Sequence, residues 1–154
     1  MSFDNLGLEE INGGDYVSPD PINNNFEKVD ALGIDYIIES GTSGEWWYRK
    51  WKSGRAECGI DYKDFGEQTL TMSSKWGNAI SASMTFGAYP ITFASRPYTM
   101  ISFEYDALMA EGRMCTVITQ SNNSVTTSPG FKMYDATAGT AHPYFGIYVN
   151  GRYA

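Results

Sequence analysis

The alternation of apolar and polar residues predicts that strands make up most of the chain from residue 34 onward. Phe145, Ile147 and Val149 occupy every second position, and Ile101 and Phe103 do the same. A side-chain period of two is typical of a strand with one face buried. We therefore expect strands over residues 46–52, 55–63, 68–73, 79–86, 97–105, 114–120, 131–135 and 143–152, with a shorter apolar strand over 35–39 before them.

Residues 79–86 show the same alternation, and one face of this predicted strand carries Ile80, Ala82, Met84 and Phe86. Turn-forming residues lie between the strands, among them Ser53-Gly54 and Ser128-Pro129-Gly130. Many short strands separated by turns at this spacing predict an all-β fold, an antiparallel β-sandwich knob over residues 34–154.

Residues 1–22 lack this alternation, and Asn-Gly-Gly and Ser-Pro-Asp-Pro sequences interrupt any regular element there. We interpret them as an N-terminal arm. The arm carries more apolar residues than a purely disordered tail would, which favours docking onto a partner. The candidate docking residues are Phe3, Leu6, Leu8, Ile11 and Tyr16.

A short helix is predicted over residues 23–33, with asparagines as N-caps and Gly33 as the C-terminal cap. Its apolar stripe recurs every three to four residues and consists of Ile22, Phe26, Val29 and Leu32. The stripe either packs on the β domain or forms a seam with copies of itself, as in a trimer. One and a half heptads are too few to decide between these two interpretations.

Three of the four tryptophans lie within residues 46–51. In a strand, Trp47 and Trp51 share one face, and Trp46 and Tyr48 share the other. Because both faces are aromatic, we expect both to be at least partly covered. Core packing, a subunit interface through Trp46 and Tyr48, and an exposed platform for stacking sugars remain open.

Net charge narrows the classes of partner. The formal charge of −7 argues against a nucleic-acid surface, which needs a basic stripe. No apolar run is long enough for a membrane span, and the first residues lack the features of a signal peptide, so we expect no secretory export. Cys58 and Cys115 are expected to be small half-buried thiols rather than a disulfide.

Residues that carry catalytic chemistry are sparse. His142 is the single histidine, whereas nucleophilic triads and most zinc sites need histidine beside further groups. One turn carries three carboxylates: Asp61, Asp64 and Glu67. They indicate either a solvated loop or a calcium site, although their spacing differs from that of an EF-hand loop. We expect no enzyme activity, no cofactor and no metal.

Strand parity suggests which loops face outward. If each strand reverses the chain, the turns at 53–54, 74–78, 106–113 and 136–142 gather at one end. Trp76 lies in a polar turn where a large aromatic side chain is hard to bury, so its exposure would favour contact with a ligand. The candidate ligand-binding residues of this tip are Lys75, Trp76, Asn78, Glu111, Arg113 and His142.

Three segments together carry a resemblance to a known family. Residues 48–54 fit the pattern aromatic-x-K-aromatic-x-S-G, residues 90–98 fit P-I-x-F-x-x-x-P-Y, and residues 143–149 form an aromatic-rich closing strand. In combination they resemble the C-terminal domain of bacteriophage tail-fibre and tail-appendage proteins, over residues 36–152. Residues 38–59 are also similar to appendage proteins of prophages from Gram-positive gut bacteria.

The resemblance implies a β-sandwich knob, usually trimeric, at the tip of a fibre that recognises the host surface. Tail fibres are commonly long, whereas only residues 1–33 precede this knob, so we expect a short appendage whose arm docks onto another virion protein. The expected protein is a virion component made in the host cytoplasm, a homotrimer that contacts a surface glycan or protein of the host. The family carries no fixed receptor residues to transfer.

Two alternatives stay open. The same domain could be a capsid or neck decoration protein, or a head fibre, with a purely structural role. It could also be a free carbohydrate-binding module, which would be a monomer that retains saccharides.

Overall fold

The structure is a computed structural model, and it describes residues 27–28, 33, 35–74, 77–105 and 115–154. The chain divides into two units, residues 1–36 and 37–154, and the fold below is that of the second. The predicted arm over 1–22 lies outside the described residues, as does most of the predicted helix over 23–33. Gly33 has a φ of 66°, which is compatible with a helix C-cap, but the helix stays a prediction.

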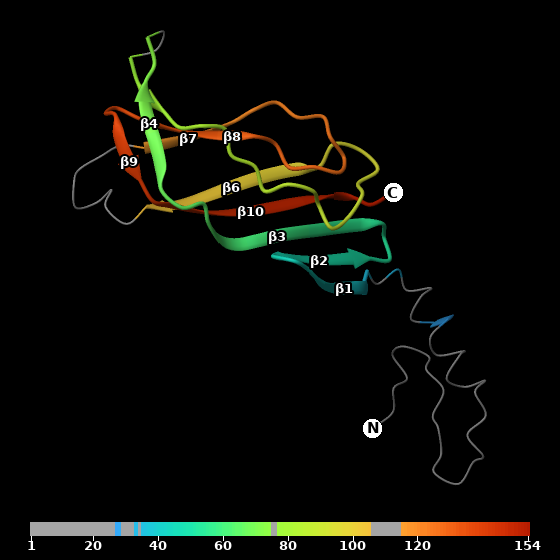
Figure 1. Ribbon diagram of the computed structural model, residues 1–154. Coiled ribbons are helices and arrows are strands. Elements are labelled where there is room, and N and C mark those ends of the chain that lie inside the picture. The colour runs from blue at the N-terminus through green and yellow to red at the C-terminus, as the bar shows by residue number, and fades with distance from the viewer. Residues whose placement is uncertain (1–26, 29–32, 34, 75–76, 106–114) are drawn as a thin grey trace. The chain divides into compact units, whose positions relative to one another are not determined.

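Residues 37–154 form two antiparallel sheets, as Figure 1 shows, and the expected all-β sandwich is thereby confirmed. The first sheet has the order β1-β2-β3-β10-β6, formed by Ile37–Ser43, Trp46–Trp51, Arg55–Asp64, Pro143–Arg152 and Tyr98–Tyr105. The second has the order β7-β8-β5-β4-β9, formed by Cys115–Thr119, Phe131–Asp135, Ala79–Ile80, Gln68–Met72 and Gly139–Ala141.

β10 shows why alternation was a good guide. Phe145, Ile147 and Val149 all point into the core and are almost fully buried. The strand lies between β3 and β6 in the first sheet, so both of its edges are hydrogen-bonded. Most of the other expected strands match within one residue at each end.

β1 begins and ends later than expected, because it includes the polar stretch from Ser40 to Ser43. Gly41 lies opposite Tyr48 on β2, and the Tyr48 ring covers the place where a side chain would stand. An aromatic neighbour compensates for glycine in an edge strand in this way. Pairing with β2 thus extends β1 beyond the short apolar strand expected over 35–39.

The predicted strand over 79–86 is wrong beyond Ile80. Ser81 is buried, and its hydroxyl accepts a hydrogen bond from the Met133 N–H at 3.0 Å. In a regular β-ladder a backbone carbonyl would accept this bond instead. The apolar phase slips after this point, since Met84 and Phe86 are buried while Ala82 is exposed. The chain then runs without a regular strand up to β6, making isolated bridges such as Met84 to Phe131.

Aromatic rings fill the space between the sheets. Phe65, Phe86, Phe131 and Phe145 form one cluster, with neighbouring ring centroids 4.8–5.5 Å apart. Edge-to-face packing of this kind adds to the free energy gained from burial. The core therefore joins the irregular segment 81–97 to both sheets.

Candidate functional site: the outer aromatic face and an edge pocket

The outward-pointing side of the first sheet is rich in aromatic residues and is not covered by the second sheet. We call it the outer aromatic face and define it by Trp47, Trp51, Tyr98, Met100, Tyr144 and Tyr148, with Tyr62 and His142 at one end. Trp47, Gly59, Tyr148 and Met100 occupy one row across β2, β3, β10 and β6. Tyr98 and Met100 are 64% and 53% exposed. A face of this composition is unusual for a sheet that meets only water.

Two glycines shape this face. A Cβ at Gly59 would lie 2.6 Å from the Ile147 carbonyl oxygen and 2.7 Å from the Trp47 ring. A β-bulge in β3 places Asp61 and Tyr62 opposite Gly146, where a Cβ would lie 2.7 Å from the Asp61 carbonyl oxygen. The missing side chains leave a shallow groove of about 190 Å³ beside Trp47 and Met100.

Charged side chains on the outer aromatic face form hydrogen bonds and cation–ring contacts with its aromatic residues. The Tyr148 hydroxyl donates to Glu57 Oε2 at 2.6 Å, and Arg49 Nη1 lies 3.5 Å from Glu57 Oε1. Trp47 Nε1 donates to Asp61 Oδ1 at 2.8 Å, while the Arg49 guanidinium lies 5.7 Å from the Trp47 ring centroid. These bonds hold the rings in fixed orientations, and fixed aromatic rings make a pre-organised contact surface.

A column of stacked rings ends the face at its β9–β10 side. Tyr62 stacks on Tyr144 with centroids 4.8 Å apart, and His142 stacks on Tyr144 at 5.2 Å. His142 Nε2 is 2.7 Å from Asp64 Oδ1. The pKa of the Asp64 carboxyl is lowered, first by the hydrogen bond from the Gly66 N–H and then by the bond with His142.

The structure separates the two faces of the tryptophan strand. Trp46 and Tyr48 do share a face, but Trp46 is only 7% exposed and packs edge-to-face on Tyr89 in the core. Tyr48 packs against the same core. Of the three interpretations left open for this strand, core packing therefore fits Trp46 and Tyr48, whereas Trp47 and Trp51 lie on the uncovered face.

One of the four turns that strand parity assigned to the predicted tip, Ser53-Gly54, lies at the other end of β3 from His142. His142 adjoins Asp64 at the end of β3, whereas the Ser53-Gly54 turn lies at its beginning, where Arg152 Nη2 donates to the Ser53 carbonyl. Asn78 is exposed beside the turn after β4, and β4 pairs with β9 at its other end. Ala79 pairs with Asp135 and Asp135 pairs with Cys115, so the described strand ends that flank the other three turns are neighbours, and the binding role of the tip stays a prediction. Four of the tip residues lie outside the described residues: Lys75, Trp76, Glu111 and Arg113.

The predicted helical stripe and docking residues also lie outside the described part of the chain: Ile22, Phe26, Val29, Leu32, Phe3, Leu6, Leu8, Ile11 and Tyr16. Their roles in trimer formation and virion docking stay predictions.

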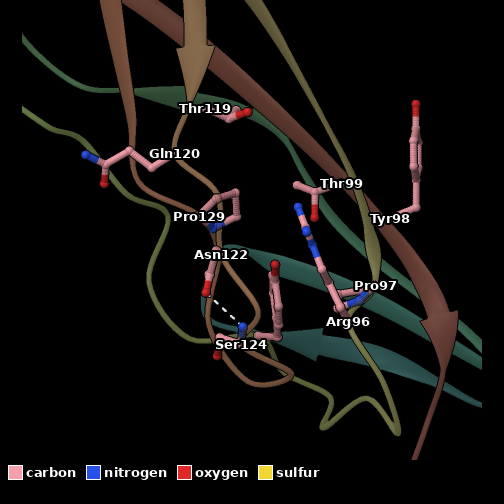
Figure 2. A pocket seen from close by; sticks show the side chains of 10 residues that line it. Arg96, Pro97, Tyr98, Thr99, Thr119, Gln120, Asn122, Ser124 and Pro129 are labelled. Carbon is pink, nitrogen blue, oxygen red and sulfur yellow. Dashed lines mark hydrogen bonds between the residues drawn. The ribbon is translucent and has the colours of Figure 1, made fainter.

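A second candidate site is a pocket at the open edge of the sandwich, shown in Figure 2. β6 and β7 are the outermost strands of their sheets, and Thr99 and Thr119 from these strands line the pocket. The loop over 120–130 closes one side. We call this the edge pocket, and its volume is about 440 Å³.

Within the part of the chain that the structure describes, no group of three or more His, Cys, Asp or Glu side chains could hold a metal ion. No helix among the same residues is long and apolar enough to cross a membrane. Cys58 and Cys115 are free thiols, and burial raises the pKa of Cys58 to about 12.

Sequence reasoning missed the edge pocket and the ring column. Arg96 stands within a segment that carried the family resemblance, yet nothing local indicates that the loop over 120–130 lies beside it. The ring column depends on the β-bulge in β3. A bulge adds one residue to a strand, and the alternation of apolar and polar residues did not indicate where this one lies.

No family model matches the sequence, and no curated protein matches it either. Two solved structures are similar in fold. One is an N-truncated R1-type pyocin tail fibre, 14% identical with a TM-score of 0.49, matched over 90% of this chain and 98% of that one. The other is an R1 pyocin fibre fragment from P. aeruginosa comprising C-terminal residues 323–701.

The second match is 13% identical, with a TM-score of 0.52, and covers 98% of this chain. It covers 34% of the pyocin fibre fragment, so the chain spans about a third of that fragment's length. At this level of identity the likeness shows the fold alone.

Proposed function

We propose that this chain is a virion structural protein of the tail-fibre type, whose β-sandwich knob forms a homotrimer and contacts the host cell surface. The observation that carries the proposal is the fold that residues 37–154 share with part of the R1 pyocin fibre. The resemblance of residues 48–54, 90–98 and 143–149 to tail-fibre domains supports it independently of the fold.

The outer aromatic face supports self-association. Tyr62, Tyr98 and Met100 expose more than half of their surface, and all three lie on the first sheet. Monomeric proteins seldom leave a contiguous apolar patch of this kind in water. Aromatic residues, Met and Arg are also the residues that concentrate at subunit interfaces. A second copy of the knob is the occupant that we propose for this face.

The remaining parts of the proposal rest on the sequence. The arm over residues 1–22 would dock onto another virion protein, and the stripe of Ile22, Phe26, Val29 and Leu32 would align three copies. Three weak host contacts on one trimer then act together, so that avidity replaces high affinity at any one knob. The work of the molecule is contact, and no enzyme activity is part of the proposal.

Particles with and without this protein test the proposal. We expect particles that lack it to adsorb poorly to host cells while keeping their resistance to heat, and the added purified protein to compete with intact particles for adsorption. Normal adsorption with loss of particle stability would instead support the capsid or neck decoration role. A purified monomer that retains neutral saccharides on an affinity column would support the free carbohydrate-binding module.

A further inference from the structure

We propose that the edge pocket is a binding site for an acidic saccharide, in which Arg96 holds the carboxylate or phosphate group of the sugar. This inference deepens the proposed function, and it rests on that function only for the choice of a saccharide as the ligand. The pocket volume of about 440 Å³ falls within the range of small-molecule sites.

Arg96 is the cation of this pocket, and none of the residues that line it is acidic. Figure 2 shows the Arg96 side chain reaching up between Thr99 and Pro129, whereas Tyr98 points away from the pocket. The pocket thus has a positive side chain and no carboxylate in its lining, although acidic residues outnumber basic ones in the chain as a whole. Guanidinium groups bind carboxylates and phosphates through two parallel hydrogen bonds.

The neutral groups around Arg96 suit a ligand rich in hydroxyls. Thr99 and Thr119 supply hydroxyls from the two edge strands, and Asn122 supplies an amide from the loop. Hydroxyl and amide groups both donate and accept hydrogen bonds, as sugar hydroxyls do. One cation among several neutral polar groups therefore matches a sugar with a single acidic substituent.

The loop that forms the far side is held in place before any ligand arrives. The Asn122 side chain accepts from the Ser124 N–H at 2.8 Å and donates to the Thr127 carbonyl at 2.9 Å. Ser124 Oγ accepts in turn from the Thr127 N–H at 3.0 Å. The loop is also joined to the segment beneath it, since the Tyr89 N–H donates to the Thr126 carbonyl at 2.8 Å. A rigid wall lowers the entropic cost of binding.

Titration of the full-length protein with four acidic sugars tests this proposal: glucuronate, galacturonate, N-acetylneuraminate and glucose 1-phosphate. Isothermal calorimetry or NMR shifts should show saturable binding of at least one of them, at least about 10-fold tighter than of glucose or galactose. The carboxylate sugars and the phosphate sugar distinguish the two kinds of acidic group. Binding should weaken as salt rises, because the ligand charge is partly exposed to solvent.

Arg96→Gln should weaken this binding about 10- to 100-fold, the loss expected for a charge-assisted bond. Arg96→Lys, which keeps the charge but not the planar fork, should retain part of it. Lys132→Gln is the matched control, because it removes one positive charge from the outer side of β8, and it should leave binding unchanged. An unaltered melting temperature shows that the Arg96 variants fold, as expected for an exposed side chain.

No binding of any acidic sugar above its neutral parent, or binding that survives Arg96→Gln, would overturn the pocket assignment. That result would leave the adsorption experiment with particles unaffected. The converse outcome is Arg96-dependent binding of the sugar together with normal adsorption of particles that lack the protein. That pair of results would support the pocket assignment and overturn the proposed function.

Discussion

Gly59 and Gly146 lie where their cross-strand neighbours leave no room for a side chain. Gly59 has the Trp47 ring and the Ile147 carbonyl oxygen as its neighbours; the hydrogen bond to Asp61 holds the ring, and the pairing of β3 with β10 holds the carbonyl. The position is not a matter of backbone conformation, since Gly59 is absent from the glycines with positive φ. The outer aromatic face therefore depends on close packing against bare backbone.

The variant Gly59→Ala should destabilise the protein by about 1–3 kcal/mol, the usual cost of forcing an extra methyl group into a packed site. The backbone oxygen of Ile147 cannot move as a flexible side chain can, so the first sheet must shift. Urea unfolding followed by tryptophan fluorescence measures the loss, and Trp47 should report the displacement directly.

Gly41→Ala is the control for this variant. Gly41 is on the edge strand β1, and its new Cβ would lie 3.1 Å from the Tyr48 hydroxyl and 3.3 Å from the Tyr48 ring, with no backbone atom among the nearest contacts. A shift of a few tenths of an ångström by the edge strand relieves these contacts, so we expect a change within about 0.5 kcal/mol. If both variants lost the same free energy of unfolding, the cause would be the replacement of a strand glycine in general and not the close packing at Gly59.

The two faces of Trp46–Trp51 illustrate what single residues reveal in sequence. Alternation correctly separated Trp46 from Trp47, because the period of two follows from strand geometry alone. Which face is inward depends on Phe86 and Tyr89, which come from an irregular segment some forty positions later and pack on Trp46. Both faces are aromatic, so polarity gave no basis for choosing.

At the scale of elements, the segment after β5 replaces strand pairing with bonds to side-chain hydroxyls. Ser81 Oγ accepts the Met133 N–H, and Ser128 Oγ accepts the Phe86 N–H at 3.0 Å. Both serines are buried, and both serve a backbone donor that a regular strand partner would otherwise satisfy. The irregular segment thus reaches the core without leaving these donors unpaired.

Ser81→Ala should lower the free energy of unfolding by about 1–3 kcal/mol, because the Met133 N–H would lose its acceptor in a site away from water. Ser83→Ala, two positions along at an exposed residue, should change it by less than about 0.5 kcal/mol. Chemical denaturation of both variants measures the difference. Equal stability of the two variants would mean that water or a backbone shift satisfies Met133 instead.

Element boundaries were predictable where alternation continued and unpredictable where side chains took over backbone bonds. β8 and β10 match their expected ranges, because their buried faces are regular. β9 was missed since its three residues, Gly139–Ala141, are too short to show a period and are defined by pairing with β4. The segment after Ile80 misled the prediction because Ser81 looks like an outward residue in the sequence.

At the scale of the whole knob, each sheet exposes a large apolar residue on its edge strand. Met100 on β6 is 53% exposed, and Ile118 on β7 is 51% exposed. Their surroundings differ: Met100 lies in a row with Tyr148 and Trp47, whereas Ile118 lies opposite Lys132. If copies associate through the outer aromatic face, only the first residue should become buried in the assembly.

The variant Met100→Arg separates these two surfaces. We expect the wild-type protein to have three times the chain mass of 17.1 kDa by light scattering at micromolar concentration, and Met100→Arg to have the mass of one chain. An unpaired charge buried at each contact costs about 3–5 kcal/mol, which weakens association about 100- to 5,000-fold. Ile118→Arg makes the same substitution on the second sheet and should leave the mass unchanged.

Because both substituted side chains are more than half exposed within one chain, neither variant should unfold it, and far-UV circular dichroism should show the same β content for both. This separates loss of association from loss of the fold. A trimer that tolerates Met100→Arg would place the subunit contacts elsewhere, with the stripe of Ile22, Phe26, Val29 and Leu32 as the remaining seam. The outer aromatic face would then be free to meet the host surface, and Trp47, Tyr148 and the column of His142, Tyr144 and Tyr62 would become the residues to substitute in adsorption assays.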